Sequence, residues 1–114
     1  MILIAKTFYI TTAIPYVNAA PHLGHALEFI QTDAIARFQR LRGRDVRLGT
    51  GSDENSLKNV HAAEARGITP AQLCKENAAV FKQLGDKVGL SYTSFIHSSL
   101  KAEHWHGPQK LWQL

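Results

Sequence analysis

Ile14-Pro15-Tyr16-Val17-Asn18-Ala19-Ala20-Pro21-His22-Leu23-Gly24-His25 is the stretch that decides the fold of this chain. It follows a run of β-branched and aromatic residues, 7–14, and precedes a long amphipathic segment that ends near Gly43. Pro15 and Asn18 favour a turn, and Pro21 suits a helix start, where a backbone N–H would be unpaired in any case. The stretch therefore predicts a strand, a tight turn and a helix that begins close to Pro21.

Two histidines lie in the first turn of this predicted helix. His22 and His25 are three residues apart, so they share one face of the helix. They lie where the unpaired N–H groups and the positive end of the helix dipole are found. Gly24 leaves the surface between them without a side chain, which lets a ligand approach the backbone. Such a site suits an anion, above all a phosphate chain.

Hydrophobic spacing, together with turn and cap residues, predicts the remaining elements. The capping box Thr69-Pro70-Ala71-Gln72 opens one of the helices, and Gly67 stops the one before it. In order, we expect a first strand formed by the apolar first ten residues and the run 7–14, a helix over 22–42, a strand over 46–49, a polar loop over 50–56, a helix over 57–66, a helix over 69–88, a strand over 92–97, and a helix restarting near Gly107-Pro108. This order predicts an α/β fold with a parallel sheet and right-handed crossovers.

The helix over 22–42 carries an apolar stripe that we expect to pack on the sheet. The stripe consists of Leu23, Leu27, Ile30, Ala34, Phe38 and Leu41. We expect Glu28, Thr32, Gln39 and Arg40 to face away from the sheet.

Asp53 follows the second predicted strand, as the histidine turn follows the first. Ligands of parallel sheets bind at the carboxyl ends of the strands, so both segments should open on one crevice. Two readings of Asp53 remain open. It caps the next helix, as Ser52 or Ser56 could also do, or it holds an ammonium group through a charge-assisted hydrogen bond.

Composition limits the class of protein. The 114 residues make one small domain or a piece of one, and the formal charge of +4, from 13 basic and 9 acidic residues, favours a polyanionic partner. The single cysteine, Cys74, supplies neither a disulfide framework nor a zinc knuckle, which fits a reducing, cytoplasmic setting. The first ten residues include Lys6 and have no basic start, so they indicate neither a signal peptide nor a membrane span.

The strand, the Pro-Tyr-Val-Asn turn and His22-Leu23-Gly24-His25 closely resemble the first signature of class I aminoacyl-tRNA synthetases. Ala13-Ile14-Pro15-Tyr16 and Gln31-Thr32-Asp33 look specifically like methionyl-tRNA synthetases. The resemblance implies the Rossmann-like nucleotide-binding fold of that class, a parallel sheet flanked by helices, of which this chain would hold the first half.

The resemblance also implies a set of site residues. His22, Gly24 and His25 would bind ATP, the two histidines acting catalytically by donating ring N–H bonds to the phosphates. The segment Gly49-Thr50-Gly51-Ser52-Asp53-Glu54 looks like the loop in which an aspartate, here Asp53, binds the α-amino group of the substrate. Ile14 and Tyr16 match positions that line the methionine pocket, and Asn18 reads as a turn residue.

One departure from the family's pattern follows Asp53. The family commonly continues with His-Gly, whereas this sequence has Asn55-Ser56. Asparagine donates and accepts hydrogen bonds but does not titrate near neutrality, which puts the role of the missing imidazole in doubt.

The implied activity is that of a methionine-tRNA ligase. Methionine would react with ATP, bound with Mg²⁺, to give methionyl-adenylate, and the aminoacyl group would pass to tRNA. Two imidazoles are too few ligands for a zinc site, and the candidates His61, His97, His104, His106 and Cys74 show no supporting spacing, so we expect no metal site within the chain.

Five arginines gather at the end of the first long helix: Arg37, Arg40, Arg42, Arg44 and Arg47. Our main interpretation is a solvated face that complements the negative end of the helix dipole. The alternative is a contact with a tRNA backbone or a nucleotide.

The resemblance covers nearly all of this chain. On the side of the synthetase, it covers only the first portion. Residues 1–114 would be an incomplete nucleotide-binding catalytic domain, ending before the inserted domain, the second half of the fold and the anticodon-binding domain. We therefore expect the isolated chain to be inactive. The alternative is a non-catalytic module that binds nucleotide or amino acid or assembles with a partner. An open sheet edge and an exposed Trp112 predict self-association, or a partner chain that completes the sheet.

Overall fold

The computed structural model describes residues 6–114, which form a parallel sheet with helices packed on it. The strands β1 (Thr7–Thr11), β2 (Asp45–Ser52) and β3 (Ser94–His97) lie in the order β1-β2-β3. Both neighbouring pairs are parallel, which confirms the predicted α/β class. The first five residues, part of the apolar start that we expected in the first strand, lie outside the described residues.

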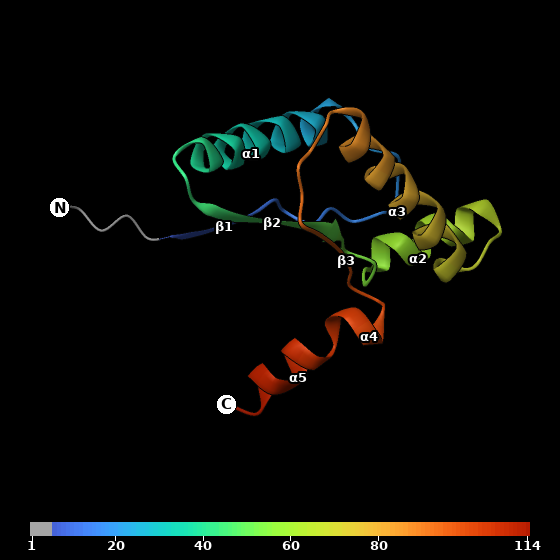
Figure 1. Ribbon diagram of the computed structural model, residues 1–114. Coiled ribbons are helices and arrows are strands. Elements are labelled where there is room, and N and C mark those ends of the chain that lie inside the picture. Colours follow the sequence, from blue (N-terminus) through green and yellow to red (C-terminus); the bar gives the residue numbers. More distant parts are fainter. Residues whose placement is uncertain (1–5) are drawn as a thin grey trace.

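The helices lie on both sides of this sheet, unevenly (Figure 1). Right-handed crossovers that advance in one direction across a parallel sheet place their helices on one face. In the picture α1 and α3 lie on one face, α2 lies beside α3 beyond the end of the strands, and α4 and α5 lie on the other side. The bounds are α1 Leu23–Leu41, α2 Leu57–Arg66, α3 Pro70–Lys87, α4 Lys101–His104 and α5 His106–Trp112. Within residues 6–114, no helix combines the length and the apolar character that crossing a membrane requires.

The helix boundaries follow the local cap residues. The Ser56 hydroxyl accepts from the Lys58 N–H at 3.0 Å, and the Thr69 hydroxyl accepts from the Gln72 N–H at 3.2 Å. Gly67 ends α2 in the left-handed conformation, with φ of 65°. These helix ends agree with the predicted ones within about two residues, which is the uncertainty of such assignments.

The strand β2 is longer than the sequence predicted, because it continues through Thr50, Gly51 and Ser52. The polar residues indicated a loop, but β3 pairs with this segment from Gly49↔Ser94 to Ser52↔His97. Gly51 makes the pairing possible, since a Cβ there would lie 2.2 Å from the Ile96 carbonyl oxygen. The prediction of a loop over 50–52 was therefore wrong.

The core consists of two clusters of buried side chains. One lies between α1 and the sheet, and the other joins α3 to the turn after β1. Burying a large apolar side chain contributes about 1.5–3 kcal/mol, so these clusters supply much of the fold's stability. Their buried members are Phe29, Ala36, Val46, Leu48 and Leu90 in the first and Val17, Cys74, Ala78 and Phe81 in the second.

The helix α1 packs on the sheet through a different face from the one predicted. Its buried residues are Phe29, Thr32, Asp33 and Ala36, whereas Leu41 is 88% exposed. The expected stripe is instead open to solvent; we call it the α1 outer stripe, and it consists of Leu23, Leu27, Ile30, Ala34, Phe38 and Leu41. The prediction that this stripe packs on the sheet, with Thr32 facing away, was wrong.

Polar residues enter the buried face of α1 because they find partners there. The Asp33 carboxylate accepts from the Ser91 N–H at 2.8 Å and from the Arg37 Nε–H. Arg37 also donates to the Gly89 carbonyl at 2.7 Å, and Arg40 donates to the Ser91 carbonyl at 3.0 Å. We call these five residues the Asp33 network. It ties α1 to the connection between α3 and β3. Arg37 and Arg40, which we predicted on a solvated face, therefore form hydrogen bonds within the protein.

The three remaining arginines of the predicted solvated face also have intramolecular neighbours. Arg42 lies over the Phe38 ring and Arg44 over the Phe8 ring, with centroid distances of 5.8 and 5.7 Å. Arg47 forms an exposed ion pair of 3.7 Å with Asp45. A contact with tRNA stays a prediction.

Candidate active site

The turn after β1 carries the two histidines and packs against α3. Val17 in this turn is fully buried, and the Asn77 side chain donates to the Val17 carbonyl at 2.7 Å. His25 contacts Phe81 of α3 edge-on, with 4.9 Å between ring centroids. The histidine turn is therefore held by packing and by hydrogen bonds to α3.

His22 and His25 cap the start of α1 with their own rings. His22 Nδ1 accepts from the Gly24 N–H at 3.0 Å, and His25 Nδ1 accepts from the His22 N–H at 3.1 Å. A neutral imidazole carries its proton on one nitrogen and accepts through the other. Both rings therefore carry the proton on Nε2 when neutral, and both offer Nε2–H as a donor.

The electrostatics of the pair favour a neutral His25. Burial, followed by the neighbouring charge of His22, lowers the pKa of His25 below the ordinary histidine value, against a smaller opposing effect of Glu28. The two rings lie 4.0 Å apart, centroid to centroid. Two protonated imidazoles at this distance would repel each other, which is consistent with the lowered pKa.

The absence of a side chain at Gly24 also makes room for the His22 ring that caps the helix. A Cβ on Gly24 would lie 2.8 Å from the Cε1 atom of His22. The missing side chain thus leaves room for the His22 ring to fold back over the first turn. The sequence had indicated a place where a ligand approaches the backbone; the structure adds this second reason for a glycine.

Beside the histidines lies a small hollow of about 280 Å³. It is formed by the turn after β1, the start of α1 and one aromatic residue of α3. The lining residues are Pro15, Tyr16, Asn18, Ala19, Ala20, His22, His25 and Phe81.

Asp53 lies next to this turn but does not line the hollow. Its N–H donates to the Pro15 carbonyl at 2.8 Å, and it forms an isolated parallel bridge with Tyr16. The histidine turn and the Asp53 loop therefore lie side by side, whereas their opening on one common crevice stays a prediction. Ser56 caps α2, while the Asp53 carboxylate accepts from the Asn55 N–H at 3.1 Å, so the alternative of Asp53 as the helix cap was wrong.

Ile14 and Tyr16, the predicted lining of a methionine pocket, present apolar surface beside Asp53. Their exposed fractions are 44% and 45%. Lys58 lies over the Tyr16 ring at 5.6 Å. Tyr16 pairs with Asp53 through the main chain, and the part of both side chains in a methionine pocket stays a prediction.

The residues that replace the family's His-Gly pair have defined structural tasks. The Asn55 side chain donates to the Ser98 carbonyl at 3.3 Å, just beyond the last paired residues of β2 and β3. Ser56 is the cap of α2. The departure thus builds a link to the end of β3.

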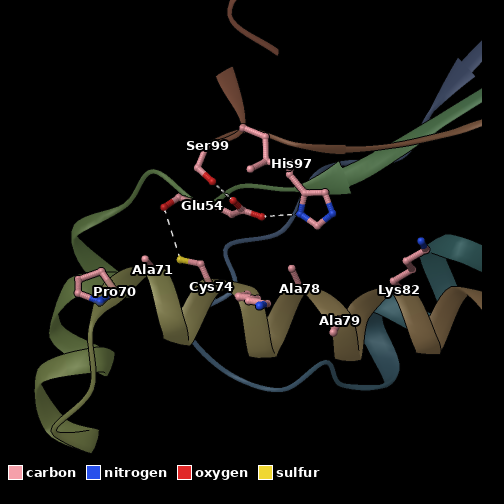
Figure 2. Close-up of a pocket in the computed structure, with 11 residues that line it drawn as sticks. Glu54, Pro70, Ala71, Cys74, Ala78, Ala79, Lys82, His97 and Ser99 are labelled. Atoms are coloured by element: carbon pink, nitrogen blue, oxygen red, sulfur yellow. Dashed lines mark hydrogen bonds and ion pairs between the residues drawn. The ribbon is translucent and has the colours of Figure 1, made fainter. Parts of the chain in front are cut away.

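Glu54 is a buried carboxylate that sequence reasoning missed. Its side chain is 6% exposed and accepts from Ser52 Oγ at 2.8 Å, from His97 Nδ1 at 2.7 Å and from Ser99 Oγ. Burial favours a higher pKa, but the hydrogen bonds from Ser99, His97 and Ser52 outweigh it, so the pKa of Glu54 lies below the ordinary glutamate value. Figure 2 shows the carboxylate between Ser99 and His97.

A second hollow, of about 690 Å³, opens beside this carboxylate, between α3 and the end of β3. Cys74 forms part of its wall, and the thiol donates to the Glu54 carbonyl at 3.7 Å. Burial raises the pKa of Cys74, followed by the charges of Glu54 and Asp53. Among the described residues, no group of three or more His, Cys, Asp and Glu side chains could hold a metal ion.

The chain is similar to known proteins of one family. A family model described as "tRNA synthetases class I (M)" matches residues 8–114. The methionine–tRNA ligase of Mycobacterium leprae is 49% identical over 108 residues, 95% of this chain and 20% of the relative. The chain thus spans about one fifth of the length of the curated relatives that it matches.

Two solved structures contain a closely similar fold. Mycobacterium tuberculosis methionyl-tRNA synthetase in complex with methionyl-adenylate matches 96% of this chain and 21% of its own, with a TM-score of 0.91 and 46% identity. A LeuRS–tRNA–LeuAMS ternary complex from Agrobacterium radiobacter K84 matches 95% of this chain and 14% of its own, with a TM-score of 0.85 and 26% identity. The Rossmann-like fold of class I synthetases is thereby established for the described residues.

Proposed function

Because this chain belongs to the class I tRNA synthetases of the (M) family, we propose that it is the first part of the catalytic domain of a methionine–tRNA ligase. The observation that carries the proposal is the side-by-side placement of the histidine turn and the Asp53 loop. The same fold belongs to a relative solved with methionyl-adenylate, the product of the activation step. In that step the methionine carboxylate attacks the α-phosphate of ATP, and pyrophosphate leaves.

His22 and His25 would bind the phosphates of ATP. Because both Nδ1 atoms accept backbone N–H groups, each neutral ring carries its proton on Nε2, and this N–H would be its donor to the phosphates. Donors that need no rearrangement stabilise charge as it develops on the phosphates. Gly24 would allow the nucleotide close to the helix start, and Mg²⁺ would arrive with the ATP.

Asp53 would bind the α-ammonium group of methionine, with Ile14 and Tyr16 against its side chain. The main chain of Asp53 pairs with Tyr16, and Ser56, the cap of α2, follows three residues later. A charge-assisted hydrogen bond to an ammonium group is roughly twice as strong as a neutral one. Alignment of the two substrates, rather than covalent chemistry by the protein, would be the main contribution of these residues.

Residues 1–114 would form an incomplete nucleotide-binding domain. The inserted domain, the second half of the fold and the anticodon-binding domain of the family would complete a cytoplasmic enzyme that acts on tRNA. We expect the isolated chain to form no acyl-adenylate unless a partner polypeptide supplies the rest. Methionine-dependent exchange of pyrophosphate into ATP by the pure chain would contradict this expectation.

Thermal unfolding tests the amino-acid site in the isolated chain. Methionine with a non-hydrolysable adenylate analogue, at a hundredfold excess over the dissociation constant, should stabilise the wild type by about 2.7 kcal/mol. In Asp53→Ala the stabilisation should disappear, because the ammonium loses its counter-charge. Asp45→Ala, at the opposite end of β2, is the matched control and should retain it.

The outcomes separate the two candidate functions. A shift that is lost in Asp53→Ala supports an amino-acid site within these residues. A cooperative transition without any shift would refute the site and favour a non-catalytic module with another ligand.

A further inference from the structure

The direction of the Asp53 carboxylate depends on the backbone path of its loop. Among the side chains that the structure describes, none donates a hydrogen bond to this carboxylate; the Asn55 N–H donates to Oδ1 at 3.1 Å. The remaining contacts of Asp53 are made by its main chain, to the Pro15 carbonyl and to the Asn59 side chain. Whatever fixes this backbone therefore aims the carboxylate.

Glu54, the next residue, joins the loop to the end of β3. Its buried carboxylate accepts from His97 and Ser99, and its N–H donates to Ser98 Oγ at 2.8 Å. The Asn55 side chain donates to the Ser98 carbonyl and lies 3.4 Å from Ser98 Oγ. These contacts lie beyond the last paired residues of the two strands, Ser52 and His97.

A carboxylate is the group that this position needs. Three donors, from Ser52, His97 and Ser99, converge on Glu54, and an ionised carboxylate is a pure acceptor with two oxygens. A glutamine there would replace a charged acceptor by a neutral amide, so the hydrogen bonds from His97 and Ser52 would lose their charge assistance and the Ser99 hydroxyl would have to turn to accept from the NH₂ group. His97 donates through Nδ1–H, since the carboxylate cannot.

We propose that Glu54, Asn55, His97, Ser98 and Ser99 form a clamp, here called the β2–β3 clamp, that positions Asp53 for binding the substrate ammonium group. The inference rests on the proposed function of Asp53. Glu54 and its partners are positioning residues, because they act through the backbone of Asp53 and do not touch the substrate. The Asn55 side chain takes part in place of the family's histidine.

The test compares Glu54→Gln with Glu76→Gln. Glu76 is an exposed carboxylate of α3 that accepts from Arg66 and Gln72, so it provides the same substitution outside the clamp. Amide hydrogen exchange at Asp53 and Asn55 should rise about tenfold in Glu54→Gln, as expected for the loss of one charge-assisted hydrogen bond. The same amides should be unchanged in Glu76→Gln.

Ligand binding distinguishes a positioning role of Glu54 from a purely structural one, because only a positioning role predicts weaker binding of methionine alone. By NMR titration, Glu54→Gln should weaken methionine binding about tenfold while leaving the affinity for a non-hydrolysable ATP analogue unchanged, because the histidine turn is not part of the clamp. Equal weakening of both ligands would overturn the positioning role. Wild-type methionine affinity in Glu54→Gln would overturn it as well.

The exchange experiment stands independently of the proposed function. If the wild type binds no methionine, the amino-acid site is refuted, and unchanged exchange at Asp53 and Asn55 in Glu54→Gln would then overturn the clamp too. Should Glu54→Gln fail to fold, Ser99→Ala removes one donor from the exposed side, with Ser94→Ala on β3 as its control. Faster exchange in Ser99→Ala than in Ser94→Ala supports the clamp, and equal exchange overturns it.

Discussion

Asp33 is a charged residue in a buried position, with its side chain 10% exposed. Burial favours a higher pKa, but the hydrogen bonds from Arg37 and Ser91 outweigh it, so the pKa of Asp33 lies below the ordinary aspartate value. The unfolded chain then binds a proton more readily than the folded one. Asp33 therefore stabilises the fold above the ordinary aspartate pKa, and this stabilisation is lost as the pH falls through the lowered one.

Asp33→Asn should consequently lower the free energy of unfolding at neutral pH, by about 1–3 kcal/mol, because Arg37 and Ser91 lose a charged acceptor. The difference from the wild type should shrink in acid, because the unfolded wild-type chain binds a proton at Asp33 at a higher pH than the folded chain does. Urea denaturation at neutral pH and near pH 3, below the ordinary aspartate pKa of about 3.9, measures both effects. Asp45→Asn, at an exposed pair, should change little, and a constant difference across pH would contradict the account.

Residues of this kind show why the site was partly predictable. The histidine turn is encoded locally, in twelve consecutive positions that contain its prolines, its glycine and its ring donors. The buried carboxylates are not, because Asp33 meets Ser91 58 positions along the chain and Glu54 meets Ser99 45 positions along it. No local pattern indicates which donors will converge on which carboxylate.

The helix α1 has apolar residues on two faces, and the two faces have different surroundings. Phe29 is 2% exposed and packs in the core, while Phe38 on the α1 outer stripe is 56% exposed. The pair allows one substitution to be compared on both faces of one helix.

Phe29→Ala should destabilise the fold by about 3–5 kcal/mol, because it leaves a cavity between α1 and the sheet. Phe38→Ala should cost less than about 1 kcal/mol, since it removes a half-exposed ring and its contact with Arg42. Chemical denaturation of both variants measures the difference. Similar losses in the two variants would place Phe38 in the core and contradict the observed face.

The elements themselves were largely predictable from the sequence, whereas their packing was not. Thr69, Ser56 and Gly67 act within one helical turn, so their signals fix helix ends without knowledge of the fold. The apolar periodicity of α1 shows which of its faces is apolar but not which face the sheet covers. That choice follows from the Asp33 network, which joins distant parts of the chain.

The whole molecule leaves apolar surface uncovered on several sides. The α1 outer stripe is exposed, and so is Trp112, at 91%. Exposed apolar patches larger than a few hundred square ångströms are rare on monomers and mark interaction surfaces. With the edge of β1 also open in the sheet order, association of the chain is the expected consequence.

The described chain should therefore self-associate at high concentration, as light scattering would show. Leu27→Lys with Phe38→Lys should reduce the association, because two charges interrupt the α1 outer stripe. Leu57→Lys adds the same charge on α2, at a residue that is 75% exposed, and should have a smaller effect. A clean monomer of the wild-type chain would contradict the prediction.

The backbone hydrogen bonds of His22 and His25 have one more consequence, for behaviour in acid. A protonated imidazole has N–H groups on both nitrogens and accepts no hydrogen bond. Protonation of His25 therefore releases the His22 N–H at the start of α1, which loosens the first turn of the helix. A protonated ring keeps its Nε2–H but loses the hydrogen bond that fixes the ring, so acid would exchange a preorganised donor at the start of α1 for a charged but less ordered one.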